Sequence, residues 1–444
     1  MERLARTDTE SQIFYADQTR LALENFPHGG RRLSDVPEFV RAYGLVKLAC
    51  ARANIELGVI DATRGEAIVA AARSVAALEH LPQFRTALVQ GGGGTSSNMN
   101  VNEVIATLAN RMLDASGLLD GDGTRVHPND HVNASQSTND TYPTAMSLTL
   151  TERAQPALAA LAGLREALLR QAEKGGTTRR LGRTCLRDAT SLSVEQTHHA
   201  QANIVGHGLT ALRESIDALR TVPLGGTVLG TGAGAPGGFA RVAVAGLSAE
   251  TGLDLASPAD VFAAMAHPDS LATVAAACRQ AAIAMARIAA DLRFLSAGPV
   301  GGPAEVVLPA LQNGSSIMPG KVNPVIPELV IQLSYRVRGN AHTAELAVAA
   351  GELELNVMGP VALDALLTCL TDIRDAATYF AEKCIDGLQW DRRATEHALS
   401  GSLDGLVDLA SANGYTAASR QAEPKQAPVV PGDIRLGTTP SNSE

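Results

Sequence analysis

Four short polar segments contain the residues of this 444-residue chain that could do chemistry. They are rich in glycine, hydroxyl and side-chain amide residues, and alanine-rich helical sequence lies around them. In chain order they read GGGGTSSNMN (91–100), HPNDHVNASQSTND (127–140), GRTCLRDAT (182–190) and QNGSSIMPGKVNPVIPE (312–328). Hydroxyls, amides and the backbone N–H groups at helix starts all donate hydrogen bonds, so segments of this kind suit the binding of a carboxylate.

The fourth segment is the hardest to explain as a structural linker. Its three prolines and two glycines disfavour a helix, at about 3 kcal/mol per interior proline and about 1 kcal/mol per glycine. A plain linker would not need two adjacent serines, Ser315 and Ser316, followed by Lys321 and Asn323. Because a hydroxyl, a fixed positive charge and an amide donor come together here, we expect a functional loop.

The other patterns have plain structural interpretations as well. SSNMN and STND could cap helices, and GGGG could be an ordinary loop. A G-x-G-x-x-G pattern at 232–237 has no long strand before it and contains a proline, so we expect no nucleotide site. His127 and His131 are four residues apart, but Pro128 argues against one helix that presents both, so we expect no metal site.

Composition favours a helical protein that works in the cytoplasm. Aromatic residues make up only 3% of the chain, so Ala, Leu, Val and Ile must build the core, which suits close helix packing. The net charge of −9, without a Lys/Arg-rich block, makes nucleic acid and anionic membranes poor partners. Five scattered cysteines and a polar N-terminus argue against a disulfide framework and a signal peptide.

The elements that must position the polar segments are mostly long helices. Helical periodicity covers 36–79 and then about 149–174, 191–220, 270–296, 325–350 and 361–383. Several of these exceed the average helix of roughly 11–12 residues, so we expect a helix bundle. Their apolar faces are broad for one chain to cover, and we expect the central helices to pack against other subunits. The apolar run at 275–295 contains four charged residues, so we expect no membrane span.

The segment GSSIMPGKVNP (314–324) resembles the signature of the aspartase/fumarase superfamily. GTSSNMNVNEVI, HPNDHVNASQSTNDTYPT, GRTCLRDA, LGGTVLGTG and GELELN resemble the other family segments, in family order, and the resemblance runs from about Phe14 to Tyr415. It implies an all-α fold with a long central helix bundle and a smaller N-terminal helical domain. It also implies a homotetramer whose active sites are shared between subunits, a small dicarboxylate substrate and no cofactor.

The domains expected from this resemblance are an N-terminal helical domain (1–134) and a central helix-bundle domain with the serine loop (135–388). A remnant of the family's small C-terminal helical domain would follow at 389–416. The last stretch, 417–444, is rich in Pro, Gly, Ser and Thr, and we expect it to be a disordered tail.

The resemblance also implies roles for individual residues. The family removes a proton from the carbon beside a carboxylate and expels a small group from a succinate-type substrate, usually giving fumarate. Ser315 would be the general base, and Lys321 and Asn323 would hold the carboxylate next to the acidic C–H. The remaining substrate-binding residues would be Thr95, Ser96, Ser137, Thr138, Asn139, Thr184 and Ser316. A second anion site would involve His127, Asn129 and Asp130.

One departure from the family pattern concerns catalysis directly. Cys185 stands where the family segment has a histidine, which pairs in relatives with an acid that corresponds to Glu328. A thiol cannot form the same charged pair, so Glu328 would lose its partner. Altered handling of the leaving group or low activity would follow.

Four activities are compatible with these motifs. SQSTND favours an aspartate ammonia-lyase, which we expect first, whereas NMNVNEV, NDTYPTAM and LRDAT favour a fumarate hydratase. A lyase that expels another group from a substituted succinate is the third. The fourth, from a different class, is an inactive relative that serves as a helical scaffold.

Overall fold

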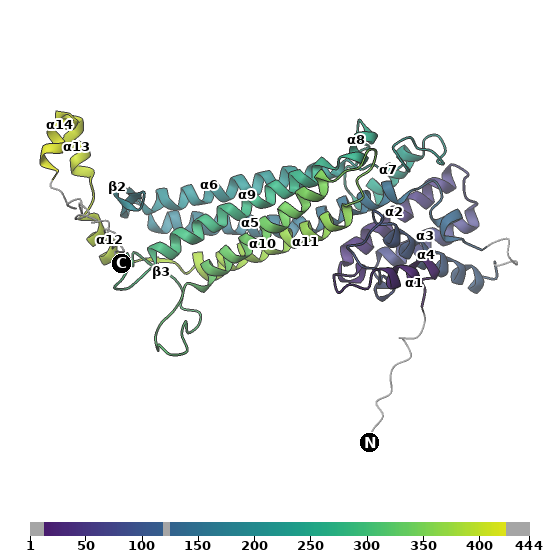
Figure 1. Cartoon of the computed structure of the whole chain (residues 1–444), viewed down its shortest axis with the longest axis horizontal. Helices are drawn as coiled ribbons and strands as arrows, with labels where there is room; N and C mark the ends of the chain where they lie inside the picture. Colours follow the sequence, from purple (N-terminus) through teal and green to yellow (C-terminus); the bar gives the residue numbers. More distant parts are fainter. Residues whose placement is uncertain (1–12, 119–124, 423–444) are drawn as a thin grey trace, which may run out of the picture.

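The computed structural model describes residues 13–118 and 125–422 of the chain. Long helices form an elongated bundle, and shorter helices gather at one of its ends (Figure 1). The bundle helices are α5 (Thr138–Gly175), α6 (Val194–Asp217), α9 (Asp269–Leu295), α10 (Val325–Ala349) and α11 (Gly359–Phe380). This confirms the predicted all-α class with a long central helix bundle.

Small side chains let the bundle helices approach closely. Ala282 and Ala289 of α9 and Ala341 of α10 have no exposed surface, and α10 packs against both α9 and α11. Within the described chain, α9 is the helix long and apolar enough to cross a membrane by length and composition. Of its most apolar stretch, 56% is buried inside the protein, so packing in the bundle accounts for its apolar character.

The group of shorter helices lies around the start of α5. It contains α1 (Asp17–Asn25), η1 (Leu33–Asp35), α2 (Pro37–Glu56), α3 (Ala62–Ala76), η2 (Leu81–Gln83), α4 (Thr95–Ala115) and η4 (Pro128–Val132). The buried carboxylate of Glu103 accepts three backbone N–H groups from the start of α1, which fixes that helix on α4. The later helix α7 (Phe239–Thr251) packs on α2, so this end of the molecule draws on both predicted domains. The connection between α6 and α9 also contains η5 (Ala218–Arg220) and α8 (Val261–Ala266).

The opposite end of the bundle contains a β-hairpin that the helical periodicity did not predict. Strands β1 (Arg179–Thr184) and β2 (Arg187–Ser193) pair in antiparallel fashion, and β3 (Val306–Val307) pairs with β4 (Gln389–Trp390) near them. The chain then continues after η6 (Ala381–Ile385) through α12 (Arg392–Leu399), α13 (Asp404–Asn413) and α14 (Tyr415–Gln421). Because α14 extends to Gln421, the predicted tail is wrong over 417–421, and 423–444 lies outside the described residues.

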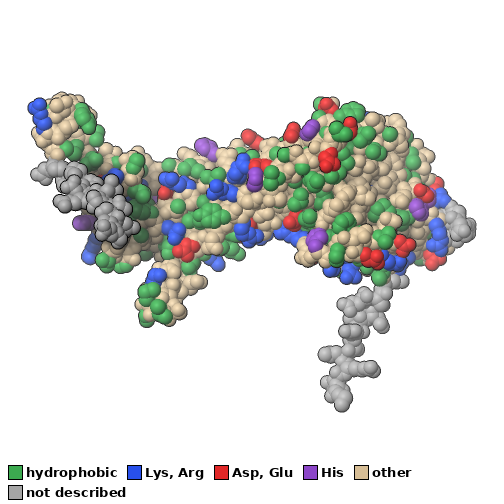
Figure 2. Space-filling view, in the orientation of Figure 1, with side chains coloured by type: hydrophobic (Ala, Val, Ile, Leu, Met, Phe, Trp, Pro, Cys, Tyr) green, Lys and Arg blue, Asp and Glu red, His purple; other side chains and the backbone are tan. Residues whose placement is uncertain are grey.

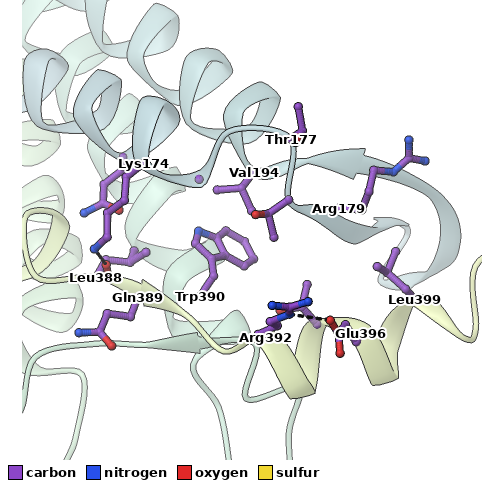
Figure 3. A pocket seen from close by; sticks show the side chains of 14 residues that line it. Lys174, Thr177, Arg179, Val194, Leu388, Gln389, Trp390, Arg392, Glu396 and Leu399 are labelled. Atoms are coloured by element: carbon purple, nitrogen blue, oxygen red, sulfur yellow. Dashed lines mark hydrogen bonds and ion pairs between the residues drawn. The ribbon is translucent and has the colours of Figure 1, made fainter.

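A cavity of about 740 Å³ lies between the end of α5, the hairpin and α12 (Figure 3). Val194 and the indole of Trp390 line it from the bundle side. Lys174 donates a hydrogen bond to the carbonyl oxygen of Leu388 at 3.3 Å, and this bond joins α5 to the segment that precedes β4.

Trp390 also anchors this end of the chain through a buried histidine. Its Nε1 donates to Nε2 of His198 at 3.1 Å, and Nδ1 of His198 lies 2.8 Å from Oε1 of Gln201. An indole N–H can only donate, so Nε2 is the acceptor and the imidazole proton sits on Nδ1, facing Gln201. Burial lowers the pKa of His198 to about 4 because the charged ring would be desolvated.

Acidification is therefore expected to release Trp390 from His198. Between pH 6.5 and 4 the unfolded chain binds a proton at this histidine that the folded chain resists. The neutral ring contributes roughly 3 kcal/mol of stability above pH 6.5, which is lost as the pH falls toward 4. Trp390 is the sole tryptophan of the chain, so its fluorescence reports the change directly. His198→Gln should lack this transition, and an unchanged transition in that variant would contradict the assignment.

Candidate functional site

The first two polar segments meet where α4 and α5 begin. Nδ2 of Asn98 in α4 donates to Oγ1 of Thr138 at the start of α5, at 3.1 Å. The close approach requires Gly94, where an added Cβ would lie 2.2 Å from the ring of Tyr142 and where φ is +97°. Of the predicted substrate ligands on these segments, Thr95 is exposed, Thr138 is buried and the others are half-buried: Ser96, Ser137 and Asn139. Two helix N-termini that carry hydroxyl side chains thus lie close together, which suits a carboxylate. Local hydrogen bonds occupy some of these hydroxyls, since Oγ1 of Thr95 donates to the carbonyl oxygen of Gly92 and Oγ of Ser137 accepts the N–H of Asn139.

The buried side chain of Asp140 holds this region together through hydrogen bonds, a role that the sequence did not predict. Its carboxylate accepts the N–H of Ser137 at 3.0 Å, and also those of Gly225 and Thr227 at 3.0 and 2.9 Å. Burial raises the pKa of Asp140 to about 6 although these three donors oppose the shift. The S-x-x-D pattern of a capping box was the available signal for the contact with Ser137. The contacts with residues 225–227 join parts of the chain that are far apart in sequence, and no sequence pattern indicated them.

The third segment forms the hairpin tip at the other end of the bundle. Thr184 ends β1, and Cys185 and Leu186 make the turn with φ of 52° and 58°, a backbone region that such residues seldom adopt. All three are exposed. The guanidinium of Arg183 pairs with the buried carboxylate of Glu305, so the hairpin is tied to the strand β3 that leads to the fourth segment.

The fourth segment is a loop between α9 and α10 that projects from the bundle (Figure 1). Oγ of Ser315 accepts the backbone N–H groups of Ile317 and Met318 at 3.3 and 3.0 Å. Nδ2 of Asn323 donates to the carbonyl oxygen of Gly314 at 2.9 Å and closes the base of the loop. Figure 2 shows the loop as a separate lobe with hydrophobic side chains, and the side chain of Ile317 is 83% exposed.

Lys321 and Glu328 lie at the C-terminal side of this loop. The side chain of Lys321 is exposed, and Glu328 is in the first turn of α10. Oε1 of Glu328 lies 3.7 Å from Nη2 of Arg293 in the same chain, and the loss of the histidine partner found in relatives stays a prediction. Both side chains are well exposed, and an ion pair of this kind contributes little to stability.

The predicted second anion site has a local hydrogen-bond arrangement of its own. Nδ1 of His127 accepts the N–H groups of Asn129 and Asp130 at 3.3 and 3.2 Å. The amides at the start of η4, which an anion would need, are therefore occupied by the preceding side chain. An anion could bind there only by displacing the His127 ring.

The predicted site residues of one chain thus fall into two groups at opposite ends of the bundle. We call Thr95, Ser96, Ser137, Thr138 and Asn139 the amide half-site. We call Thr184, Cys185, Ser315, Ser316, Lys321, Asn323 and Glu328 the serine half-site. Helix α5, which runs between the two ends, has 38 residues and is about 57 Å long at 1.5 Å per residue. A four-carbon dicarboxylate is far shorter, so one copy of the chain does not bring the two half-sites onto one substrate.

Comparisons with known proteins agree with the motifs. Residues 6–339 match a family model described as Lyase. The fumarate hydratase class II of Mycobacterium tuberculosis is 40% identical over 415 residues, which cover 93% of this chain and 85% of that protein. The aspartate ammonia-lyase of Corynebacterium glutamicum is 39% identical over 386 residues, which cover 87% of this chain and 73% of that protein.

Solved structures give the same relationship. The fumarate lyase:delta crystallin from Brucella melitensis has a TM-score of 0.87 and 37% identity, covering 95% of this chain and 91% of that one. The class II fumarase from Schistosoma mansoni has a TM-score of 0.87 and 31% identity, covering 93% and 89%. Fold, motif order and sequence identity over nearly the whole chain all agree, and the chain therefore belongs to the aspartase/fumarase superfamily of lyases.

Proposed function

We propose that this chain forms fumarate from a succinate-type substrate by eliminating a small group, with loss of water from malate as the first reaction to consider. The observation that carries the proposal is the environment of Ser315, whose Oγ accepts two backbone N–H groups in an exposed loop. Both hydrogen bonds become charge-assisted when Oγ loses its proton, which lowers the cost of the alkoxide relative to a free serine.

In this proposal Ser315 removes the proton from the carbon beside a substrate carboxylate. The C–H electron pair first moves onto that carboxylate and then forms the new C=C bond, as the leaving group departs from the neighbouring carbon with its own bonding pair. A departing hydroxide takes up a proton to leave as water, and Ser315 returns the proton that it took to solvent. The intermediate carries two negative charges on one carboxylate, so donors fixed in advance supply much of the catalysis. Lys321 lies in the same loop and would supply the positive charge. Gly320, with φ of +82°, gives that loop a backbone conformation that other residues rarely adopt.

The amide half-site of another copy would hold the second carboxylate. We therefore propose a homo-oligomer, a homotetramer by family resemblance, in which several copies build each site. Exposed apolar side chains on the bundle helices support this assembly, among them Ile204 of α6, Ile283 of α9 and Leu346 of α10, which are 42%, 48% and 58% exposed. Figure 2 shows such side chains along the bundle between charged ones.

The two leading candidate activities, fumarate hydratase and aspartate ammonia-lyase, differ in the leaving group. The Mycobacterium tuberculosis relative at 40% identity is a fumarate hydratase, which favours water and malate. The motif SQSTND and the Corynebacterium glutamicum aspartate ammonia-lyase at 39% identity favour ammonia and aspartate. We place the hydratase first, which reverses the order favoured by the motif.

The experiment that tests the proposal is a substrate panel. The purified chain is incubated with malate, aspartate and other substituted succinates, and fumarate is followed by its ultraviolet absorbance. Turnover of malate supports the first candidate, and turnover of aspartate alone supports the second. Turnover of another succinate alone indicates the variant lyase. No fumarate from any of them, at protein concentrations that keep the oligomer assembled, would overturn the enzymatic proposal in favour of the scaffold.

Cys185→His is expected to move the substrate profile toward the ordinary substrates of the superfamily. An imidazole restores the proton-transfer group that the thiol replaces. We expect kcat/KM for malate or aspartate to rise about ten-fold, or about 1.4 kcal/mol in transition-state stabilisation. Leu186→His is the matched control, because it places the same ring at the adjacent exposed turn position. Identical profiles for the parent chain and Cys185→His would show that the site is indifferent to this position.

A further inference from the structure

A fully buried lysine lies beneath the amide half-site. Lys47 of α2 has no exposed surface, and its Nζ donates to Oδ1 of Asn133 at 3.0 Å and to Oε1 of Gln136 at 2.9 Å. It also lies 5.7 Å from the centroid of the Tyr43 ring. Lysine is almost never fully buried unless it is paired, yet here the acceptors are neutral amide oxygens. Burial lowers the pKa of Lys47 to about 8, because the charged amine is desolvated.

The side chain of Asn133 connects Lys47 to the amide half-site. Oδ1 of Asn133 accepts Nζ of Lys47 and also Nδ2 of Asn98 at 3.1 Å and of Asn102 at 3.2 Å. The same Nδ2 of Asn98 donates to Oγ1 of Thr138 at 3.1 Å. An ammonium group can only donate, so it dictates that the oxygen of the Asn133 amide, not its nitrogen, faces Asn98.

Lys47 also supports a turn in an uncommon conformation. Ser135 has φ of 62°, and the turn around it leads directly into Ser137. Gln136, held at Oε1 by Lys47, donates through Nε2 to the carbonyl oxygens of Val132 and Ala134, both at 3.0 Å. A backbone conformation of this kind persists only where its surroundings enforce it.

We propose that Lys47 is a positioning residue, whose buried ammonium fixes Asn133 and Gln136 and thereby the turn that presents Ser137, Thr138 and Asn139 to a substrate carboxylate. The proposal rests on the proposed function of the amide half-site. An apolar side chain of the same length would fill the site without the desolvation cost of a buried charge. The position of Lys47 therefore serves the turn rather than the packing of α2.

Lys47→Met is the direct test, with steady-state kinetics on malate, or on aspartate if the panel selects it, and thermal unfolding in parallel. We expect KM to rise about ten-fold or more while kcat stays within about three-fold, because the lost contacts hold a carboxylate equally in the bound substrate and the transition state. Lys47→Gln retains one donor and should give an intermediate KM. Lys47→Met should also lower the midpoint of unfolding, because Oε1 of Gln136 loses its lysine donor, so the kinetics are compared at a temperature where both variants are folded.

Gln171→Met is the matched control. Gln171 is also buried and donates to two carbonyl oxygens, those of Ile385 and Asp386, but at the other end of α5. Its replacement should leave KM unchanged. An equal rise of KM in Gln171→Met and Lys47→Met would overturn the proposal, since general loosening would then explain both. An unchanged KM in Lys47→Met would also overturn it.

Asn98→Ala keeps the proposal testable if Lys47→Met fails to fold. It removes the link between Asn133 and Thr138 without touching Lys47, and we expect a similar rise in KM. Where both variants fold, the double variant should show little further rise, because the two changes interrupt one chain of contacts. Additive increases of KM in the double variant, or an unchanged KM in Asn98→Ala, would overturn the proposal that Lys47 acts through Asn133 and Asn98. Failure of the proposed function is distinct, because the parent chain itself would then give no turnover.

Discussion

Replacing Ser315 with alanine is expected to lower kcat by roughly 10²- to 10⁴-fold, the usual contribution of a general base. The side chain of Ser315 is half-buried, and its Oγ accepts two amide hydrogen bonds from within the same loop. Alanine removes the group that takes the proton and leaves the closure of the loop by Asn323 and Gly314 intact. The bundle helices do not depend on this hydroxyl, so assembly should be unchanged.

The rate of fumarate formation at saturating substrate measures this effect, and size-exclusion chromatography verifies the assembly. Ser296→Ala is the matched control, because Ser296 is also half-buried and follows the end of α9, outside the loop. It should retain the parent rate. A Ser315→Ala protein with more than about a tenth of the parent kcat would place the base on another residue.

Two separately inactive variants are expected to regain activity when their chains are mixed. Ser315→Ala disables the serine half-site, and Thr95→Asp disables the amide half-site, because a carboxylate at this exposed position repels a dicarboxylate. The half-sites lie at opposite ends of one chain, so each working site takes them from different copies. Random mixing at equal amounts then leaves about a quarter of the sites with both halves intact.

Co-expression, or joint refolding of the two variants, followed by the fumarate assay measures the recovery. Thr95→Asn is the control for the charge of the aspartate: it keeps a neutral hydrogen-bond donor at this position, so the unmixed protein should lose much less activity than Thr95→Asp. Recovery to about a quarter of the parent rate is the expected result. Activity no higher than in either variant alone, in oligomers shown to contain both chains, would mean that one copy supplies both half-sites.

Apolar periodicity located the later bundle helices closely. The predictions at 270–296, 325–350 and 361–383 correspond to α9, α10 and α11, because long alanine- and leucine-rich stretches between proline and glycine leave few alternatives. The start of α5 was placed too late, at about 149 instead of Thr138. The polar residues of that first stretch and Pro143 disfavour a helix locally, and burial against neighbouring elements outweighs this preference.

The composition of the site was more predictable than its geometry. Hydroxyl and amide clusters stand out from a helical background, so the four segments could be found from the sequence. Their division into two half-sites depends on the path of α5, and the contacts of Lys47 and Asp140 join residues far apart in the chain. The hairpin was missed because its turn uses Cys185 and Leu186 rather than glycine or asparagine, the usual signals.

The distance between the two ends of α5 has a consequence for how the protein behaves on dilution. If residues from several copies build each working site, then a free monomer is inactive even when it is correctly folded. Specific activity would fall steeply at concentrations near the subunit dissociation constant and rise again on concentration. A truncated copy made in the same cell would also inactivate intact copies, because each mixed oligomer would contain incomplete sites.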